Sequence, residues 1–120
     1  ALLYVAPGSI TPVQQFLAGL RRTNPRGFRA ATPPFVLPLG PGVGLAESPP
    51  GEDESFGAQR CRLTAKGLLS WLEGDAPTAW SGVSTQFASH GLDASQPWLG
   101  VLPSSWVARA RSVMRPAARR

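Results

Sequence analysis

The sequence contains few of the residues that build disulfides, metal centres and membrane spans. Among its 120 residues are one cysteine, one histidine and one methionine. Cys61 has no partner for an internal disulfide, and a cysteine-rich metal cluster is excluded. No apolar run approaches the roughly 18 residues that a membrane span needs, since the longest run, around Phe35, is broken by Pro38. We therefore expect no transmembrane span, no metal site and no cofactor.

Acidic residues are also scarce, and they are unevenly placed. The chain has twelve basic and seven acidic residues, which gives a formal net charge of +5. Four of the acids, Glu47, Glu52, Asp53 and Glu54, lie within eight residues of one another. The rest of the chain is therefore strongly basic. This excess favours an anionic neighbour such as RNA, an acidic protein surface or anionic lipid.

Arginine supplies nearly all of the positive charge, in two clusters. Arginine forks bind phosphate and carboxylate groups through paired hydrogen bonds. An aromatic residue that could stack on a base, Phe28 or Trp106, lies near each cluster. A solvated helix face with a basic tail would explain the same residues. The candidate contacts with an anionic partner or RNA are Arg21, Arg22, Arg26, Arg29, Arg109, Arg111 and Arg115.

Local patterns predict three short helices, at about 12–22, 64–73 and 104–115. In the first, Thr11 is the expected N-cap, and an apolar stripe at helical spacing follows it. Alternating residues at 60–63 and 83–87 predict short strands. The stripes expected on the first two helices are Val13, Phe16, Leu17 and Leu20, and Ala65, Leu68, Leu69 and Leu72.

Proline and glycine account for 26 residues, which lowers the expected content of regular structure. We therefore predict a mostly irregular chain with short α-helices and at most a few short strands. The fold class is a small α or α+β unit with an extended arm. The expected parts are an N-terminal tail and helix (1–29), an extended Pro/Gly-rich and acidic segment (30–59), and a small helical unit with a basic tail (60–120).

The extended segment combines stiffness with apolar side chains. Ten of the nineteen residues from Pro33 to Gly51 are proline or glycine. Such a backbone has few conformations to lose, so it can lie along another surface at low entropic cost. We therefore expect its apolar side chains to bind a partner. The candidate partner-binding residues are Phe35, Val36, Leu37 and Leu39.

These features together predict a non-catalytic structural subunit of a large multi-subunit assembly. A basic chain without disulfides and with an extended arm is typical of peripheral components of organellar machines. The expected location is the mitochondrion or chloroplast, in a ribosome or an energy-transducing membrane complex. The expected partners are other protein subunits, with rRNA or anionic lipid as further candidates. His90, just before Gly91, is interpreted as a surface residue in a turn, and no catalytic residue is assigned.

An alternative function follows from RCRLTAKGLLSWLEG, residues 60–74. This stretch is similar to the local pattern of winged-helix DNA-binding domains, in which a wing strand leads into L-T-x-K-G and a closing helix. Leu63, Thr64, Lys66 and Gly67 carry the resemblance. It implies a nucleic-acid-binding protein with a recognition helix between residues 25 and 45. Prolines in that region disfavour such a helix, so winged-helix binding stays the alternative.

Overall fold

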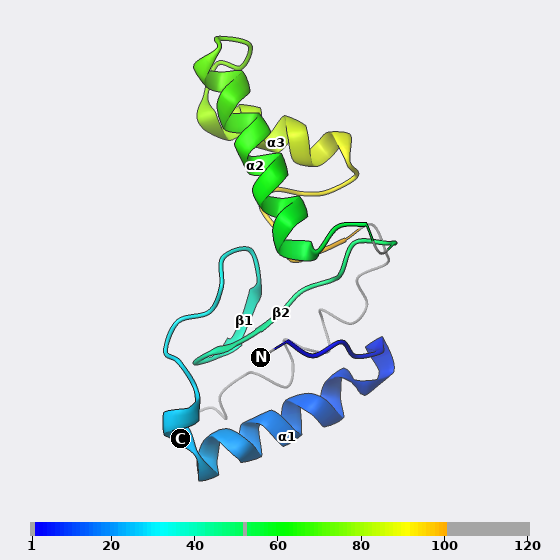
Figure 1. Ribbon diagram of the computed structural model, residues 1–120, viewed down its shortest axis with the longest axis vertical. Coiled ribbons are helices and arrows are strands. Elements are labelled where there is room, and N and C mark those ends of the chain that lie inside the picture. Colours follow the sequence, from blue (N-terminus) through cyan, green and yellow to red (C-terminus); the bar gives the residue numbers. More distant parts are fainter. Residues whose placement is uncertain (1, 52, 101–120) are drawn as a thin grey trace, which may run out of the picture. The chain divides into compact units, whose positions relative to one another are not determined.

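The computed structural model describes residues 2–51 and 53–100 (Figure 1). The helix predicted at 104–115 lies outside the described residues, as do Arg109, Arg111 and Arg115. The chain divides into two compact units. The described part of the first unit is 2–32 and 38–44, and that of the second is 33–37, 45–51 and 53–100. The three-part division expected from the sequence stays a prediction.

The predicted fold class, a small α or α+β unit, is confirmed. Two short 3-10 turns flank the first helix, and two neighbouring strands form a small antiparallel sheet. Two further helices follow the sheet. In chain order the elements are η1 (Pro7–Ser9), α1 (Ile10–Thr23), η2 (Pro25–Gly27), β1 (Leu37–Gly40), β2 (Val43–Leu45), α2 (Phe56–Leu72) and α3 (Ala79–Ser89).

Helix α1 confirms the helix predicted at 12–22 but begins two residues earlier. Ser9, and not Thr11, occupies the N-cap, and its side chain makes no capping hydrogen bond. Pro12 is then the third helical residue, which is tolerated because the first N–H groups of a helix have no intrahelical partner. At the other end, the Asn24 N–H donates to the Leu20 carbonyl at 2.8 Å. Pro25 follows, and because a proline disfavours helical conformation in the residue before it, the helix ends here.

The Pro/Gly-rich segment forms a β-hairpin from β1 and β2 rather than running extended throughout. Its turn is Pro41–Gly42, and Gly42 has φ +72. Proline followed by a left-handed glycine is the sequence signature of a type II turn. Pro38 is exposed on β1, where a two-stranded sheet leaves an edge that does not need its missing N–H. Proline thus shapes this ribbon without excluding strand pairing.

Helix α2 begins at Phe56, so the strand predicted at 60–63 is wrong. Ser55 is the true N-cap, and its side chain accepts a hydrogen bond from the Ala58 N–H at 3.2 Å. Thr64, the first residue of the helix predicted at 64–73, lies inside α2 and donates to the Arg60 carbonyl at 2.8 Å. The end of the helix is as predicted, because Gly74 adopts the left-handed conformation (φ +86) just beyond it.

The strand predicted at 83–87 is also wrong, because these residues lie in α3. Thr78 and Ser81 form a capping box at its start: the Ser81 N–H donates to Thr78 Oγ1 at 3.0 Å, and the Thr78 N–H donates to Ser81 Oγ at 3.1 Å. Val83 and Phe87 are four residues apart, so they share one helix face. The same residues therefore fit a helix as well as a strand, and the capping box at Thr78 and Ser81 favours the helix.

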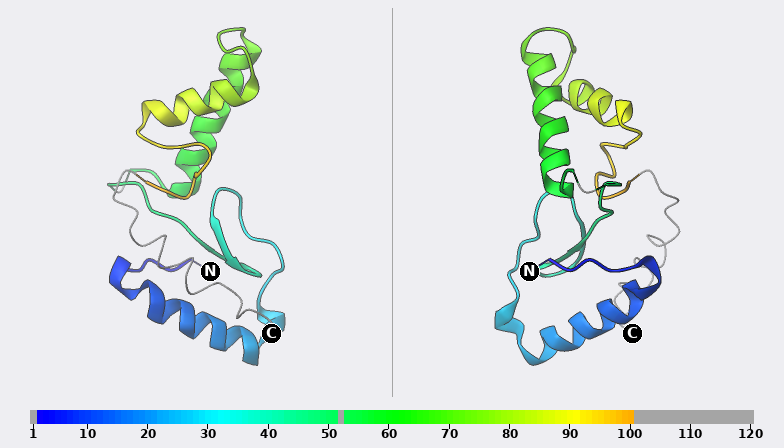
Figure 2. Two further views of the ribbon diagram at one scale, coloured as in Figure 1. Left: turned by 180° about the vertical axis from the view of Figure 1, so that it is seen from behind. Right: turned by 45° about the vertical axis from the view of Figure 1, so that its right-hand side comes forward.

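Helices α2 and α3 pack against each other in the second unit, as the two views of Figure 2 show. The core of this unit is Leu63, Phe87 and Leu92, with Val83 and Ala94 packed against it. The two helices approach most closely at a pair of buried glycines. A Cβ atom on Gly67 would overlap the backbone of Val83, and one on Gly82 would overlap the Gly67 carbonyl. Close backbone contact therefore defines the helix crossing.

An ion pair joins α2 to the residues that precede it and gives a pH-dependent prediction. Arg62 Nε and Nη2 donate to Glu54 Oε1 and Oε2 at 2.7 and 2.9 Å. This hydrogen bonding lowers the pKa of Glu54 below its ordinary value of 4.5. Because the pKa is depressed on folding, the pair stabilises the fold above pH 4.5, and its contribution is lost as pH falls through the lowered pKa.

Arg62→Ala is expected to lower the midpoint of urea unfolding slightly at neutral pH and to have no effect at low pH. The effect is small because both side chains are accessible to solvent. Unfolding followed by circular dichroism at stepwise lower pH checks this, with Arg26→Ala as the control for loss of one exposed arginine. A difference between wild type and Arg62→Ala that persists at the lowest pH would contradict the assignment.

Candidate functional site

The charges of the described residues separate by unit. Residues 1–46 contain four arginines and neither aspartate nor glutamate. The described part of the second unit is instead net acidic, with six carboxylates and three basic side chains. Those carboxylates are Glu47, Asp53, Glu54, Glu73, Asp75 and Asp93, and the bases are Arg60, Arg62 and Lys66.

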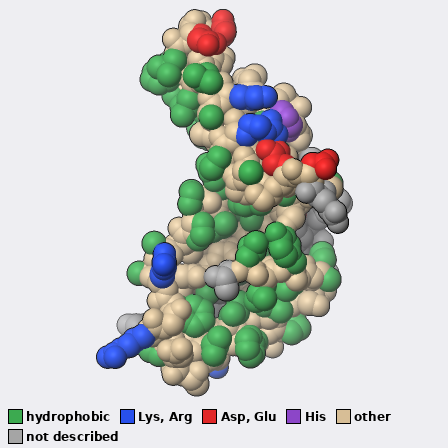
Figure 3. All heavy atoms as spheres, in the orientation of Figure 1, with side chains coloured by type: hydrophobic (Ala, Val, Ile, Leu, Met, Phe, Trp, Pro, Cys, Tyr) green, Lys and Arg blue, Asp and Glu red, His purple; other side chains and the backbone are tan. Residues whose placement is uncertain are grey.

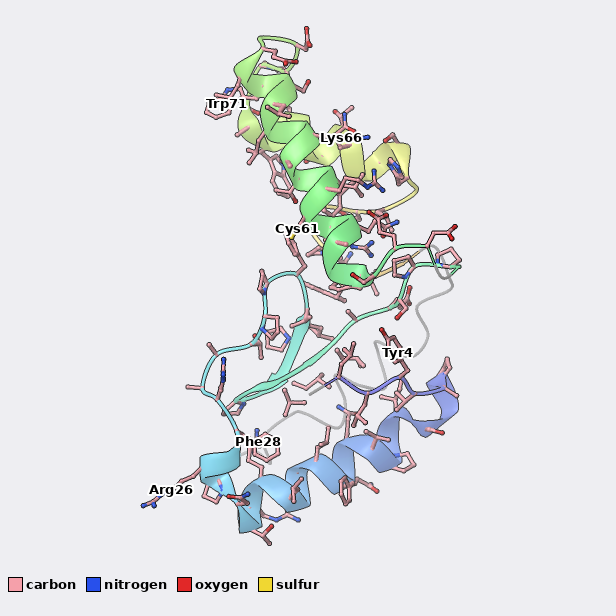
Figure 4. All side chains as sticks on the ribbon, viewed as in Figure 1. Tyr4, Arg26, Phe28, Cys61, Lys66 and Trp71 are labelled. Carbon is pink, nitrogen blue, oxygen red and sulfur yellow. The ribbon has the colours of Figure 1, made fainter. Side chains whose placement is uncertain are left out.

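The four arginines in the described part of the first unit lie at the end of α1, in η2 and just after it. Arg21 and Arg22 lie in the last turn of α1, where the helix dipole favours cations. Arg26 lies in η2, and Arg29 comes shortly after it. All are exposed except Arg21, which is half-buried. Figure 4 shows the Arg26 side chain pointing away from the backbone of η2. We call residues 21–29 the arginine segment.

The turn of the hairpin packs against this segment within the first unit. A Cβ atom on Gly40 would overlap the Arg21 guanidinium, and one on Gly42 would overlap the Arg29 backbone. Both glycines also have positive φ, a conformation that other residues rarely adopt. The structure therefore brings the predicted residues Arg21, Arg22, Arg26 and Arg29 onto one scaffold. The backbone of these two glycines lies close to Arg21 and Arg29, the first and last arginines of the segment, and holds both ends of the segment in place.

The apolar stripe predicted on α1 is largely accessible. Phe16 is 66% exposed and Leu20 is 42% exposed. A shallow groove along this face is lined by both residues together with Gln15, Gly19, Arg22 and Thr23. The buried residues of the helix are Ile10 and Gln14. Helical periodicity thus predicts the helix correctly, but most of its apolar stripe does not contribute to the core.

The four predicted partner-binding residues fall into two groups. Leu37 and Leu39, on β1, are 9% and 6% exposed, so the chain itself covers them. Phe35 and Val36 are half-buried, and Phe35 has φ +70. Partner contact through these residues stays a prediction. Only Phe35 and Val36 keep appreciable accessible surface for it in this conformation.

A buried arginine forms a second polar centre, inside the second unit. Arg60 is 1% exposed. Its Nε donates to the Pro97 carbonyl at 2.7 Å and its Nη2 to the Leu99 carbonyl at 2.9 Å, while Nη1 donates to Gln59 Oε1. The guanidinium also lies 4.7 Å from the centre of the Phe56 ring. Burial lowers the pKa of Arg60, and the charge of Glu47 opposes this effect.

A cavity of about 100 Å³ adjoins Arg60 and is lined by His90 among others. His90 Nδ1 lies 3.0 Å from Ser89 Oγ and 3.1 Å from the Gln86 carbonyl oxygen. These are local contacts at the end of α3. They agree with the interpretation of His90 as a residue at a turn. Two of the Arg60 donors, Nε and Nη2, bind the main-chain carbonyls of Pro97 and Leu99, so the geometry of Arg60 is that of a cross-link between α2 and residues 97–99.

The sequence analysis missed the role of Arg60 because it placed this residue in a strand. One signal could have found it. If Ser55 is taken as the N-cap, Arg60, Leu63 and Gly67 fall at i, i+3 and i+7 on one helix face. Those are the residues of α2 that the structure buries.

Comparison with known proteins identifies the chain by family. The model of the HopA1 effector protein family matches residues 1–99, which is most of the chain. The chain therefore belongs to the HopA1 effector protein family. No curated protein and no solved structure gives a significant match.

Family membership corrects the function and location predicted from composition. The match points to a bacterial secreted effector, so the prediction of a structural subunit in a mitochondrial or chloroplast assembly is wrong. The winged-helix alternative also fails, since residues 60–63 are helical where a wing strand was expected. In the described part of the chain, no helix has the length and hydropathy of a transmembrane segment.

Proposed function

We propose that this chain acts as a bacterial secreted effector and binds an acidic protein of the host cell through the arginine segment. The observation that supports this most directly is the charge of residues 1–46, which hold four arginines and no carboxylate. A surface of one sign attracts partners of the opposite sign and speeds their association. Arg26 and Arg29 are exposed, so their guanidinium groups are available to carboxylates.

An acidic protein fits this surface better than a nucleic acid does. Four arginines along nine residues give a short basic segment, and residues 30–59 add no further lysine or arginine that would extend it along a phosphate backbone. Phe28, which could stack on a base, is half-buried between Arg26 and Arg29. The proposed activity is binding and not catalysis.

Reversing two charges is expected to weaken partner binding about tenfold or more, because interface arginines are frequent hot spots. The variant is Arg26→Glu combined with Arg29→Glu. The wild-type chain is cross-linked in host-cell extract, its acidic partner is identified by mass spectrometry, and the purified pair is then measured by titration at several salt concentrations. Lys66→Glu, an exposed charge reversal in the second unit, is the matched control.

Two results would count against this function. One is equal affinity of wild type and the double variant for the purified partner. The other is recovery of RNA in place of protein, with binding lost after nuclease treatment. A steep fall of affinity with salt for the wild type and a shallower one for the variant would support it, since fewer ionic contacts mean weaker salt dependence.

A further inference from the structure

The apolar stripe predicted on α2 faces away from the core of its unit. Leu68, Leu69 and Leu72 are 38%, 54% and 71% exposed, while the opposite face carries buried Leu63 and Gly67. Figure 3 shows hydrophobic side chains gathered over the end of α2, next to carboxylates. Trp71 on α2 and Trp80 on α3 are 42% and 60% exposed. We call Leu68, Leu69, Trp71, Leu72 and Trp80 the α2 patch.

A cluster of large exposed side chains of this kind is typical of an interaction surface, because monomeric proteins rarely leave such patches uncovered. Its border is acidic: Glu73 and Asp75 follow Leu72 directly and are exposed. Helix α2 presents Leu68 and Leu72 four residues apart, the spacing of a ridge that packs against another helix. The surface therefore suits an amphipathic helix whose polar border is basic.

The chain itself carries a helix with those properties. On α1, Phe16 and Leu20 are exposed and also four residues apart. Arg22 shares their groove, and no carboxylate occurs on this helix or anywhere in residues 1–46. We call Phe16, Leu20 and Arg22 the α1 face. The two surfaces match in helical spacing and are opposite in the sign of their bordering charge.

We propose that the α2 patch of one molecule binds the α1 face of a second copy of this chain. The contact is heterologous, because each copy uses two different surfaces. Such contacts propagate head to tail into rings or open chains. Arg22 belongs to both the α1 face and the arginine segment. The variants that test the host interaction (Arg26 and Arg29) and those that test self-association (Phe16 and Leu72) share no residue, so the two proposals can fail separately.

The test mixes two variants of the full chain, each lacking one surface. Leu72→Glu abolishes the α2 patch and Phe16→Glu abolishes the α1 face; both residues are exposed, so the folds are expected to survive. In sedimentation velocity, the average sedimentation coefficient of wild type is expected to rise with protein concentration, while each variant alone stays monomeric. An equimolar mixture is expected to form a one-to-one dimer and nothing larger, because each variant keeps one intact surface. Leu3→Glu, at 63% exposure, is the matched control and is expected to assemble like wild type.

Three outcomes would overturn the proposal. Wild type that stays monomeric at every concentration would exclude self-association. A mixture that stays monomeric would show that the two surfaces do not bind each other. Assembly blocked by Leu72→Glu but not by Phe16→Glu would show that the α2 patch pairs with a copy of itself. Circular dichroism of each variant confirms that a loss of assembly is not a loss of folding.

Discussion

Gly67→Ala is expected to destabilise the second unit by about 2 to 3 kcal/mol, although the same change inside a helix ordinarily stabilises it by up to about 1 kcal/mol. The reversal follows from the crossing of α2 and α3. A Cβ atom at this position would lie 2.7 Å from the Gly82 carbonyl carbon and would overlap the backbone of Val83. Backbone atoms cannot rotate aside as a side chain can, so the helices must separate. The core of Leu63 and Phe87 between them then loses its packing.

Urea unfolding of the full chain, followed by far-ultraviolet circular dichroism, measures this loss. Gly57→Ala is the matched control, since Gly57 is exposed on the same helix and no atom lies within 4 Å of its added Cβ. It is expected to be neutral or to gain a few tenths of a kcal/mol. Gly82→Ala removes the other half of the crossing and is expected to act in the same direction as Gly67→Ala. Equal stability of Gly67→Ala and Gly57→Ala would disprove the close contact.

The sequence predicts the existence of the helices better than their orientation. In α1, the spacing of apolar residues and the Asn24–Pro25 stop suffice to predict the helix. In α2 the same kind of spacing predicts a helix, yet the stripe faces solvent. The interior face depends on Gly67, a residue type that disfavours helices, and on Arg60, a residue type that is mostly exposed in folded proteins. The face of α2 that packs against α3 depends on both helices, because the crossing needs Gly82 as well as Gly67.

The two wrong strands have a common cause. Four or five alternating residues, as at 60–63 and 83–87, fit a strand and a helix equally well. Capping residues decide between them, and both caps lie just upstream of the ambiguous stretch. Thr78 with Ser81 is a recognisable capping box. Ser55 lies within the acidic part of residues 30–59, which the sequence predicts to be extended, so it is not recognised as a cap.

The hairpin was partly predictable, but the function was not. Pro41–Gly42 is a turn signal, whereas the left-handed backbone of Phe35 (φ +70) has no signature in the sequence. A basic, proline-rich chain with a single cysteine is compatible with an organellar subunit and with a secreted effector, because composition specifies neither the partner nor the compartment. Composition therefore could not separate these classes, and the family match did.

Arg60→Met is expected to lower the stability of the second unit by about 3 kcal/mol, because the substitution leaves two partly buried main-chain acceptors without the guanidinium donors. The carbonyls of Pro97 and Leu99 both lose a hydrogen bond from the guanidinium. Methionine keeps an unbranched apolar stem and the contact with Phe56, so loss of packing contributes little. Arg60→Lys is expected to recover only part of the loss, because one ammonium group cannot reproduce the fork that reaches both carbonyls.

The same substitutions show which effect of Arg60 on stability is larger, the stabilisation by its hydrogen bonds or the cost of burying its charge. Burial lowers the pKa of Arg60, which shows that taking its charge out of water is unfavourable. If that cost dominated, Arg60→Met would unfold at the wild-type urea concentration or above it. If the hydrogen bonds of Arg60 outweigh the burial cost, residues 97–99 become more mobile in Arg60→Met. The hydrogen bond from the Glu47 N–H to the Trp98 carbonyl, at 2.9 Å, remains. Amide hydrogen exchange at residues 98–100 should then quicken in Arg60→Met. It should stay unchanged in Arg62→Met, the control for an accessible arginine on the same helix.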